Sequence, residues 1–145
     1  MKGKIFHPDE ANRMLPLVSR IADDIVATYT RIQRALEALE AEKNYYEEGR
    51  SSQDSAAEEA HEAQLRRLDE EIARYLDRFQ SLIEEIEALG GTVKDYERPC
   101  IDFYGEVDGK IVYLCWQRGE ESIAHWHKLE EGFDRRRDLH IASAA

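Results

Sequence analysis

Apolar residues recur with a helical period over the first part of the chain. From Pro8 to about Glu48 they follow one another at steps of mostly three and four, which predicts one buried stripe along a helix. The stripe consists of Met14, Val18, Ile21, Ile25, Thr28, Ile32, Leu36 and Leu39. Pro8 and the two acids after it suit a first helical turn, because the proline lacks an N–H that would have no partner there. Pro16 interrupts the pattern and predicts a kink or a short first helix.

A second helical stripe follows a polar turn near residues 49–55. Its steps of three and four alternate without a break, as in a heptad seam. The seam consists of Leu65, Leu68, Ile72, Tyr75, Phe79, Leu82, Ile86 and Leu89. Gly90 and Gly91 end this helix, since the first glycine supplies the left-handed conformation that a helix C-terminus often needs. Residues 8–89 are therefore expected to form a long antiparallel two-helix hairpin that resembles a coiled coil.

After Gly91 the period changes to the alternation of a β-sheet. Residues 100–107 and 110–116 flank Asp108-Gly109, the strongest short signal for a β-hairpin. A two-residue loop there predicts three cross-strand pairs: Val107 with Lys110, Tyr104 with Tyr113, and Asp102 with Cys115. One face of this hairpin is apolar and is expected to pack on the helices; it carries Ile101, Phe103, Val112, Leu114 and Trp116. The two cysteines, Cys100 and Cys115, would lie diagonal to each other, too far apart for an unstrained disulfide.

A third strand is predicted over residues 122–127, and its register has two alternatives. An even-length loop before it places His125 and His127 on the apolar face. A three-residue loop places both on the polar face, which also carries Asp102 and Cys115, and turns the tryptophan between them toward the core. The alternation of side chains leaves both registers open.

These elements predict an α+β fold in a single domain over residues 1–145. Residues 92–141 supply a small three-stranded antiparallel sheet and a C-terminal segment. They are too few to cover both helices, each of which reaches roughly 50–60 Å at about 1.5 Å per residue. The helices therefore form either a thin coiled-coil arm or, as we expect from the width of the apolar stripe, the four-helix bundle of a homodimer.

The composition limits the partners and the compartment. Charged residues make up 35% of the chain and the mean hydropathy is −0.67, as in helices with wide solvated faces. The net charge of −11 argues against a nucleic-acid partner. The sequence contains no run of about 20 apolar residues that would span a membrane, and its N-terminus lacks the apolar core of a signal peptide. We therefore expect a cytoplasmic protein without a membrane partner, in which both cysteines are free thiols.

Several short segments, in their order and spacing, resemble the bacterial domain-of-unknown-function family 2203. They are Glu10-Ala11-Asn12-Arg13-Met14-Leu15-Pro16-Leu17-Val18, Val93-Lys94-Asp95, Ile101-Asp102-Phe103, Val112-Tyr113-Leu114-Cys115-Trp116, Trp126-His127 and Gly132-Phe133. The resemblance covers both ends of the chain, while the middle matches only in being helical. It implies a short cytosolic protein and a loose association with metal binding. His127 matches the pattern of the family, whereas His125 is particular to this chain.

Side chains that bind metals gather in the C-terminal part of the chain. His125 and His127, two residues apart on one strand, point to the same side, which is common for two imidazole ligands of one metal ion. Candidates for further ligands are Asp102, Cys115, Glu120, Glu121, Glu130 and Glu131. Alternatively, both histidines are partly buried polar residues with a structural role. A thiolate with imidazoles favours zinc, whereas carboxylates with imidazoles leave iron, manganese or nickel open.

Three other residues are candidates for a ligand pocket. Asn12 and Arg13, near the start of the first helix, either reach a polar pocket at the junction of helix and sheet or cap and pair locally. Trp116 either lines such a pocket or belongs to the core. Cys115 opposite a carboxylate is a poor nucleophile, because the negative charge raises the pKa of a thiol. No general base stands at a recognisable spacing, so the sequence does not predict an enzyme.

Two classes of function follow from these observations. The first is a cytosolic protein that binds a divalent transition metal ion, zinc or iron, or a small ligand at the sheet near His127. The second is a non-enzymatic interaction or assembly protein that uses the helical hairpin, with the sheet as a structural cap.

Overall fold

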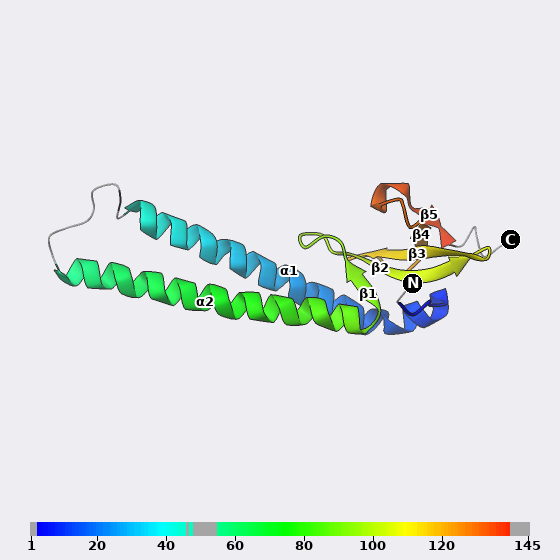
Figure 1. Cartoon of the computed structure of the whole chain (residues 1–145), viewed down its shortest axis with the longest axis horizontal. Helices are drawn as coiled ribbons and strands as arrows, with labels where there is room; N and C mark the ends of the chain where they lie inside the picture. Colours follow the sequence, from blue (N-terminus) through cyan, green and yellow to red (C-terminus); the bar gives the residue numbers. More distant parts are fainter. Residues whose placement is uncertain (1–2, 46, 48–54, 140–145) are drawn as a thin grey trace. The chain divides into compact units, whose positions relative to one another are not determined.

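The computed structural model describes residues 3–45, 47 and 55–139. Two helices precede an antiparallel sheet, which makes the fold α+β (Figure 1). The elements are α1 (Pro8–Tyr45), α2 (Ser55–Ala88), β1 (Gly91–Val93), β2 (Cys100–Val107), β3 (Lys110–Gln117), β4 (His125–His127), the short 3₁₀ helix η2 (Phe133–Arg135) and β5 (Arg137–Asp138). The turn expected near residues 49–55 lies outside the described residues, except for Ser55, which begins α2.

The chain divides into two compact units. The sheet unit comprises residues 1–26 and 82–145, and the helical unit comprises residues 27–81. Each unit therefore contains a part of both helices, and the whole sheet belongs to the first unit. Among the described residues, no helix has the length and the apolar character that crossing a membrane would need.

Helix α1 begins at Pro8, as expected, and runs through Pro16 without a break. The expected short first helix is therefore wrong. Leu15 and Val18, on either side of the proline, are buried, and this burial outweighs the single hydrogen bond that Pro16 cannot donate. The predicted stripe is buried at Val18, Ile21, Ile25, Thr28 and Ile32, but Leu36 is 47% exposed.

The seam predicted for α2 is buried or half-buried at every position, as the pattern requires. In the helical unit Leu68 is buried, and the rings of Tyr29 and Phe79 contact each other with centroids 6.1 Å apart. In the sheet unit Leu82 and Ile86 are fully buried. After Ala88 the helix closes on Gly90, whose φ of 100° is the left-handed conformation expected there.

The hairpin between β2 and β3 has the predicted register. Val107 pairs with Lys110, Tyr104 with Tyr113, and Asp102 with Cys115. Asp108 and Gly109 both have positive φ, 51° and 77°, as a two-residue type I′ turn requires. The face predicted to be apolar is buried at all five positions, Ile101, Phe103, Val112, Leu114 and Trp116.

The apolar face of the sheet packs against the parts of α1 and α2 that belong to the sheet unit. Phe6, just before α1, contacts Phe103 edge-on at a centroid distance of 5.5 Å. Gly91 lies so close to Ile86 of α2 and Ile101 of β2 that a Cβ atom there would come within 3.0 Å of both. A glycine at this position lets β1 start directly behind the helix (Figure 1).

The sheet has five strands in the order β1-β2-β3-β4-β5, so the expectation of three strands is wrong. The two additional strands are short edge strands of three and two residues. β1 pairs with β2 directly after the glycines that end α2, and β5 pairs with β4 through two charged residues. Neither segment carries enough residues to display an alternating pattern. The third predicted strand, now β4, begins at His125 rather than at residue 122.

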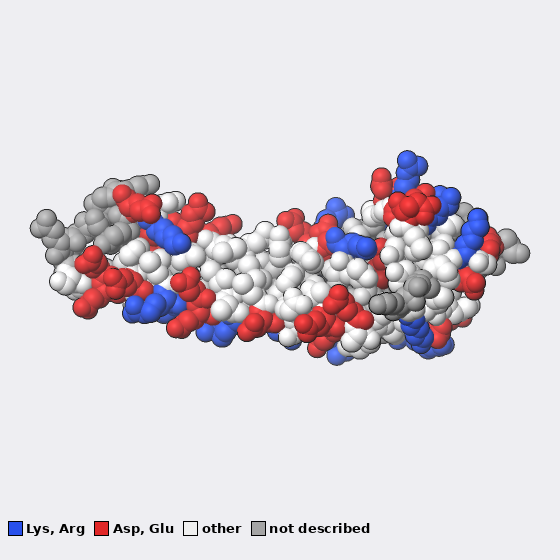
Figure 2. Space-filling view, in the orientation of Figure 1, with Lys and Arg blue, Asp and Glu red and all other residues white. Residues whose placement is uncertain are grey.

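Charged side chains cover much of the surface. On the face shown in Figure 2, lysines and arginines are interspersed with aspartates and glutamates, and the described residues form no continuous basic surface on that face. Such an arrangement agrees with the net charge of −11.

Candidate metal centre

The register of β4 places both histidines of the sheet on its polar face. His127 pairs with Tyr113, and His125 pairs with Cys115. Trp126 between them pairs with Leu114 and therefore lies on the opposite face. Of the two registers that the sequence allows, the structure has the one that brings the histidines to the side of Asp102.

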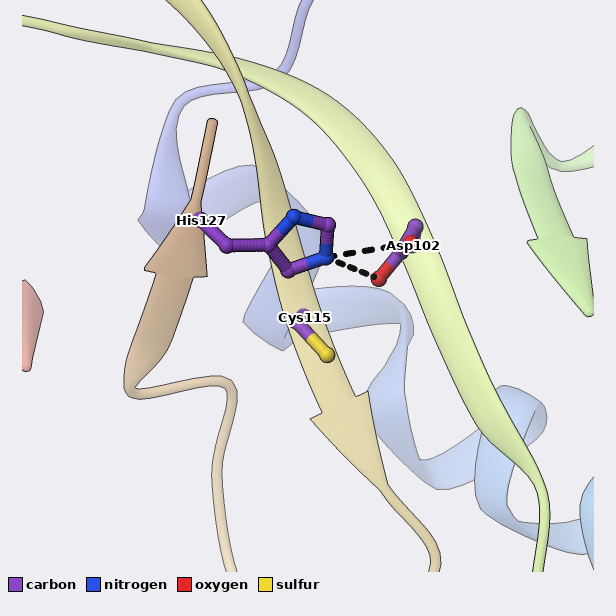
Figure 3. A group of neighbouring side chains, drawn as sticks. All are labelled: Asp102, Cys115 and His127. Carbon is purple, nitrogen blue, oxygen red and sulfur yellow. Dashed lines mark hydrogen bonds and ion pairs between the residues drawn. The ribbon is translucent and has the colours of Figure 1, made fainter. Parts of the chain in front are cut away.

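Three strands each contribute one side chain to a buried cluster. Asp102 of β2, Cys115 of β3 and His127 of β4 offer ligand atoms that all lie within 4.8 Å of one another (Figure 3). The three residues, called the triad below, are only 3%, 1% and 2% exposed. Polar groups so deeply buried require partners inside the protein.

The ring of His127 is oriented by a backbone contact. Its Nδ1 lies 2.8 Å from the carbonyl oxygen of Lys128. A carbonyl oxygen can only accept a hydrogen bond, so Nδ1 carries a proton and donates. In the neutral imidazole the other nitrogen, Nε2, then presents a lone pair, and it faces both carboxylate oxygens of Asp102 at 3.3 Å.

A second buried sulfur, that of Cys100, lies next to the triad. The Cys115 thiol forms a hydrogen bond with Cys100, which lies diagonally across the β2–β3 pair, and both cysteines are free and buried. The hydrogen bond with Cys100, burial and the Asp102 carboxylate all raise the pKa of the Cys115 thiol. Cys115 is therefore a neutral thiol unless a cation binds it, which agrees with the sequence-based view of a poor nucleophile.

Two tyrosines extend the polar face beyond His127. Tyr104 and Tyr113 stack with centroids 5.1 Å apart, and the Tyr113 ring lies 5.4 Å from the His127 ring. The hydrogen bond with Tyr104, together with burial, raises the pKa of Tyr113 to about 12. Tyr113 thus contributes a neutral aromatic wall rather than a phenolate.

The triad lies at a cavity of about 470 Å³, called the triad pocket below. Its other lining residues come from the β1–β2 loop, from β2 and β3, and from the segment after β4: Lys94, Asp95, Arg98, Cys100, Tyr113, Gln117, Leu129, Glu131, Gly132 and Phe133. Cavities of this size commonly bind small ligands, and such cavities are lined by apolar side chains and a few polar groups.

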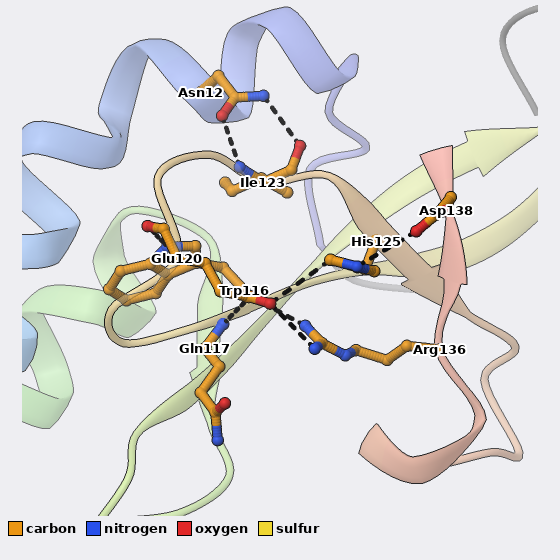
Figure 4. Close-up of polar contacts among 8 residues, drawn as sticks. All are labelled: Asn12, Trp116, Gln117, Glu120, Ile123, His125, Arg136 and Asp138. Atoms are coloured by element: carbon orange, nitrogen blue, oxygen red, sulfur yellow. Dashed lines mark hydrogen bonds and ion pairs between the residues drawn. The ribbon is translucent and has the colours of Figure 1, made fainter. Parts of the chain in front are cut away.

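His125 belongs to a different polar network (Figure 4). Its Nε2 lies 3.3 Å from Asp138, and its Nδ1 lies 3.6 Å from Glu120. Glu120 in turn accepts two hydrogen bonds from Arg136, at 2.9 and 3.0 Å, and one from the backbone N–H of Gln117 at 2.7 Å. This network ties β5 and the segment before it to the end of β3.

The remaining acidic candidates also lie apart from the triad. Glu121 and Glu130 are exposed, and each borders a separate hollow. Glu131 borders the triad pocket, but both of its oxygens accept hydrogen bonds from Arg137, at 2.7 and 3.2 Å. The hydrogen bonds with Arg137 and with the backbone N–H of Lys128 lower the pKa of Glu131 to about 2. The structure thus brings together three of the predicted metal ligands: Asp102, Cys115 and His127.

Asn12, Arg13 and Trp116 do not line the triad pocket, although Asn12 borders the separate hollow that Glu121 also borders. Asn12 accepts a hydrogen bond from the N–H of Ile123 at 2.7 Å and donates to the carbonyl of the same residue at 3.1 Å. Arg13 is exposed and does not line the triad pocket. Trp116 is 1% exposed, and its indole N–H donates to the carbonyl of Glu120 at 2.9 Å. Trp116 therefore lies in the core, which was one of the two alternatives for it.

Sequence reasoning missed the cations and the second sulfur beside the triad. Lys94 and Arg98 precede β2 in a loop without periodicity, so no pattern connected them with the polar face. The diagonal placement of Cys100 was predicted, and it is the signal that would have placed this sulfur near a Cys115-based site.

Comparisons with curated proteins and with solved structures found no significant match. A comparison with protein families matched residues 4–139 to the family described as "Uncharacterized conserved protein (DUF2203)". The match extends over nearly the whole chain, including the helical middle that the short sequence segments left uncovered. The chain therefore belongs to the DUF2203 family.

Proposed function

We propose that this protein binds a divalent transition metal ion through Asp102, Cys115 and His127. The observation that carries the proposal is that three side chains with possible metal-ligand atoms converge in a buried site. With the Nδ1 proton committed to Lys128, the Nε2 lone pair faces a carboxylate at 3.3 Å. Two acceptors in that position repel each other unless a cation or a proton lies between them.

A proton shared by His127 and Asp102 would satisfy those two residues alone. A metal ion also accounts for Cys115, the third residue of the triad. Its sulfur lies within 4.8 Å of the ligand atoms of Asp102 and His127, and the thiol becomes a charged thiolate only when a cation binds. The backbone contact of His127 fits this interpretation, since a metal-binding histidine usually donates its other N–H to a carbonyl or carboxylate.

The ligand chemistry favours zinc. A thiolate combined with an imidazole suits Zn²⁺, and one carboxylate is compatible with it, whereas iron is the second choice for a site rich in oxygen and nitrogen. Three protein ligands leave a fourth position, which would face the triad pocket. Zinc sites of this kind hold water or a small ligand in the open position.

The proposal is tested by metal analysis of protein purified without a histidine tag. We expect about one zinc ion per chain after reconstitution, and an affinity at least about 100-fold lower for His127→Ala, since even the loss of an indirect partner costs about 10- to 100-fold. His125→Ala is the matched control, because it removes an imidazole from the same strand and face outside the triad. Substoichiometric metal that His127→Ala leaves unchanged would overturn the proposal.

The helices support a second candidate, self-assembly of the chain through the helical unit. Leu36, a member of the predicted stripe of α1, is 47% exposed, and Leu76, which follows the seam residue Tyr75 in α2, is 51% exposed. The occupant that we propose for these side chains is the helical unit of a second copy, which would complete a bundle of four helices. On the face in Figure 2, uncharged side chains form a band along the helices.

Sedimentation equilibrium tests this second candidate. We expect the wild-type chain to sediment as a dimer and the double variant Leu36→Glu/Leu76→Glu to sediment as a monomer. The matched control, Gln33→Glu/Ala73→Glu, makes both substitutions at exposed positions of the same helices and should remain dimeric. A monomeric wild-type chain, or two double variants with equal effects, would contradict the assembly.

A further inference from the structure

The triad pocket has an apolar side and a charged rim. Tyr113 of β3 forms part of its wall, and Leu129 and Phe133 border it with 44% and 40% of their surfaces exposed. Exposed apolar side chains around a concave polar floor are typical of a site for a small molecule with an apolar part.

The two carboxylates of the rim already have partners. Glu131 is held by both terminal nitrogens of Arg137 and accepts the Lys128 N–H at 3.0 Å. Asp95 accepts the backbone N–H groups of Glu97 and Arg98, at 2.9 and 3.4 Å, and so shapes its own loop. Because Arg137 neutralises Glu131, only Asp95 opposes the remaining cations of the rim.

Those cations are Lys94 and Arg98. The ammonium group of Lys94 lies 5.3 Å from the centroid of the Tyr113 ring, which directs it over the wall of the pocket. Arg98 borders the same pocket, and neither side chain forms an ion pair with another residue in the described parts of the chain. At the rim, Lys94 and Arg98 thus outnumber Asp95, because Arg137 already neutralises Glu131, although the chain as a whole carries a net charge of −11.

We propose that the triad pocket binds a small organic carboxylate with a compact apolar or aromatic tail. This inference rests on the proposed metal site. Within the site, the positive charge of the ion is balanced by Asp102 and a Cys115 thiolate, so that Lys94 and Arg98, opposed by Asp95, leave the pocket with a net positive charge. The carboxylate binds between the open metal position and this pair of cations, and the tail packs against Tyr113, Leu129 and Phe133.

A carboxylate fits the pocket better than a phosphate does. A single guanidinium matches the planar carboxylate with two parallel hydrogen bonds, whereas phosphate sites generally combine several cations or the N–H groups of a helix N-terminus. The rim offers one guanidinium and one ammonium group, and its lining residues lie on strands and loops, apart from Gly132 and Phe133 at the start of the three-residue 3₁₀ helix η2.

Cobalt-substituted protein tests this inference with phenylacetate as the probe. Co²⁺ reports its own binding through its visible absorption, before any acid is added. We expect phenylacetate to change that absorption in a saturable way and the neutral amide phenylacetamide to leave it unchanged. Arg98→Gln should weaken phenylacetate binding about tenfold, as expected for the loss of a hydrogen-bonded charge.

Control variants test the metal site and the carboxylate site separately. Lys94→Gln should weaken phenylacetate binding severalfold, while Lys110→Gln, which borders a different hollow, should leave it unchanged. A protein that takes up no cobalt overturns the metal proposal and this inference with it. A protein that takes up cobalt but does not respond to phenylacetate, or responds equally to phenylacetamide or inorganic phosphate, overturns the inference alone.

Discussion

His125 and His127 occupy the same strand and the same face of the sheet, yet their rings have different surroundings. The side chain of His125 is 28% exposed and lies between Glu120 and Asp138. His127 is almost fully buried, and the Lys128 carbonyl fixes which of its nitrogens carries the proton. Two histidines that alternation alone makes equivalent are therefore chemically distinct.

Asp102→Asn tests the role of the carboxylate with little change of shape. The amide can still donate a hydrogen bond to Nε2 of His127, but it removes the charge that a divalent cation needs. For the wild-type chain, zinc at about 100 times its dissociation constant should stabilise the fold by about 2.7 kcal/mol, which raises Tm by roughly 5–10 °C. Asp102→Asn should fold without metal and lose most of this zinc-dependent shift, as measured by calorimetry.

The same experiment distinguishes a metal ligand from one half of a simple ion pair. If Asp102 and His127 only form a buried ion pair, Tm of the wild-type chain will not respond to zinc, and Asp102→Asn will destabilise the metal-free protein by as much as about 3–5 kcal/mol. Circular dichroism of the metal-free wild-type chain and of metal-free Asp102→Asn establishes that both are folded.

Glu131 offers a prediction about pH at the edge of the triad pocket. Its hydrogen bonds to Arg137 and Lys128 lower its pKa from the ordinary 4.5 to about 2. A lowered folded-state pKa means that the stabilising contact is fully present above pH 4.5 and is lost as the pH falls toward about 2. The carboxyl carbon resonance of Glu131 should therefore titrate near pH 2, and Arg137→Gln should move the midpoint upward; a wild-type midpoint near 4.5 would contradict the contact.

At the level of elements, the long helices and the central hairpin were predictable because each carries many repeats of its own period. Asp108-Gly109 also fixed the register, and with it the pairing of Asp102 with Cys115. The edge strands β1 and β5 were not predictable, since two or three residues cannot express a period and the neighbouring strand decides whether they pair.

The candidate site was predictable only in part, because one of its three strands is too short to show a period of its own. Asp102 and Cys115 followed from the hairpin, but the contribution of β4 depended on the path of residues 118–124. That path is set by contacts distant in sequence, above all the two hydrogen bonds between Asn12 of α1 and Ile123. A local pattern contains no information on such contacts.

Asn12 therefore gives a prediction at the scale of elements. Asn12→Ala leaves both backbone groups of Ile123 without their partner, which should lower the free energy of unfolding by about 1–3 kcal/mol. The connection to β4 should loosen, with faster amide exchange at Ile123, while the zinc stoichiometry stays at the wild-type value because the triad is unchanged. Urea unfolding and hydrogen exchange measure the first two effects. Arg13→Ala, the exposed neighbour, serves as the control and should change neither.

For the whole molecule, the two candidate functions belong to different units. The triad and its pocket lie entirely in the sheet unit, whereas Leu36 and Leu76 lie in the helical unit. Variants of one unit should consequently leave the property of the other unchanged: the monomeric double variant should bind zinc with wild-type affinity, and His127→Ala should remain dimeric.

The net charge of the chain determines how its self-association should respond to salt. Two copies that each carry −11 repel each other, and this repulsion is screened within about 10 Å at 0.1 M salt but reaches about 30 Å at 0.01 M. Contacts between apolar side chains such as Leu36 and Leu76 have no compensating attraction of charges. Association should therefore become tighter as the salt concentration rises from about 0.01 to 0.15 M, which sedimentation equilibrium at several ionic strengths measures. Association that weakens with salt would instead point to ion pairs between copies, and it would exclude the exposed leucines as the main contact.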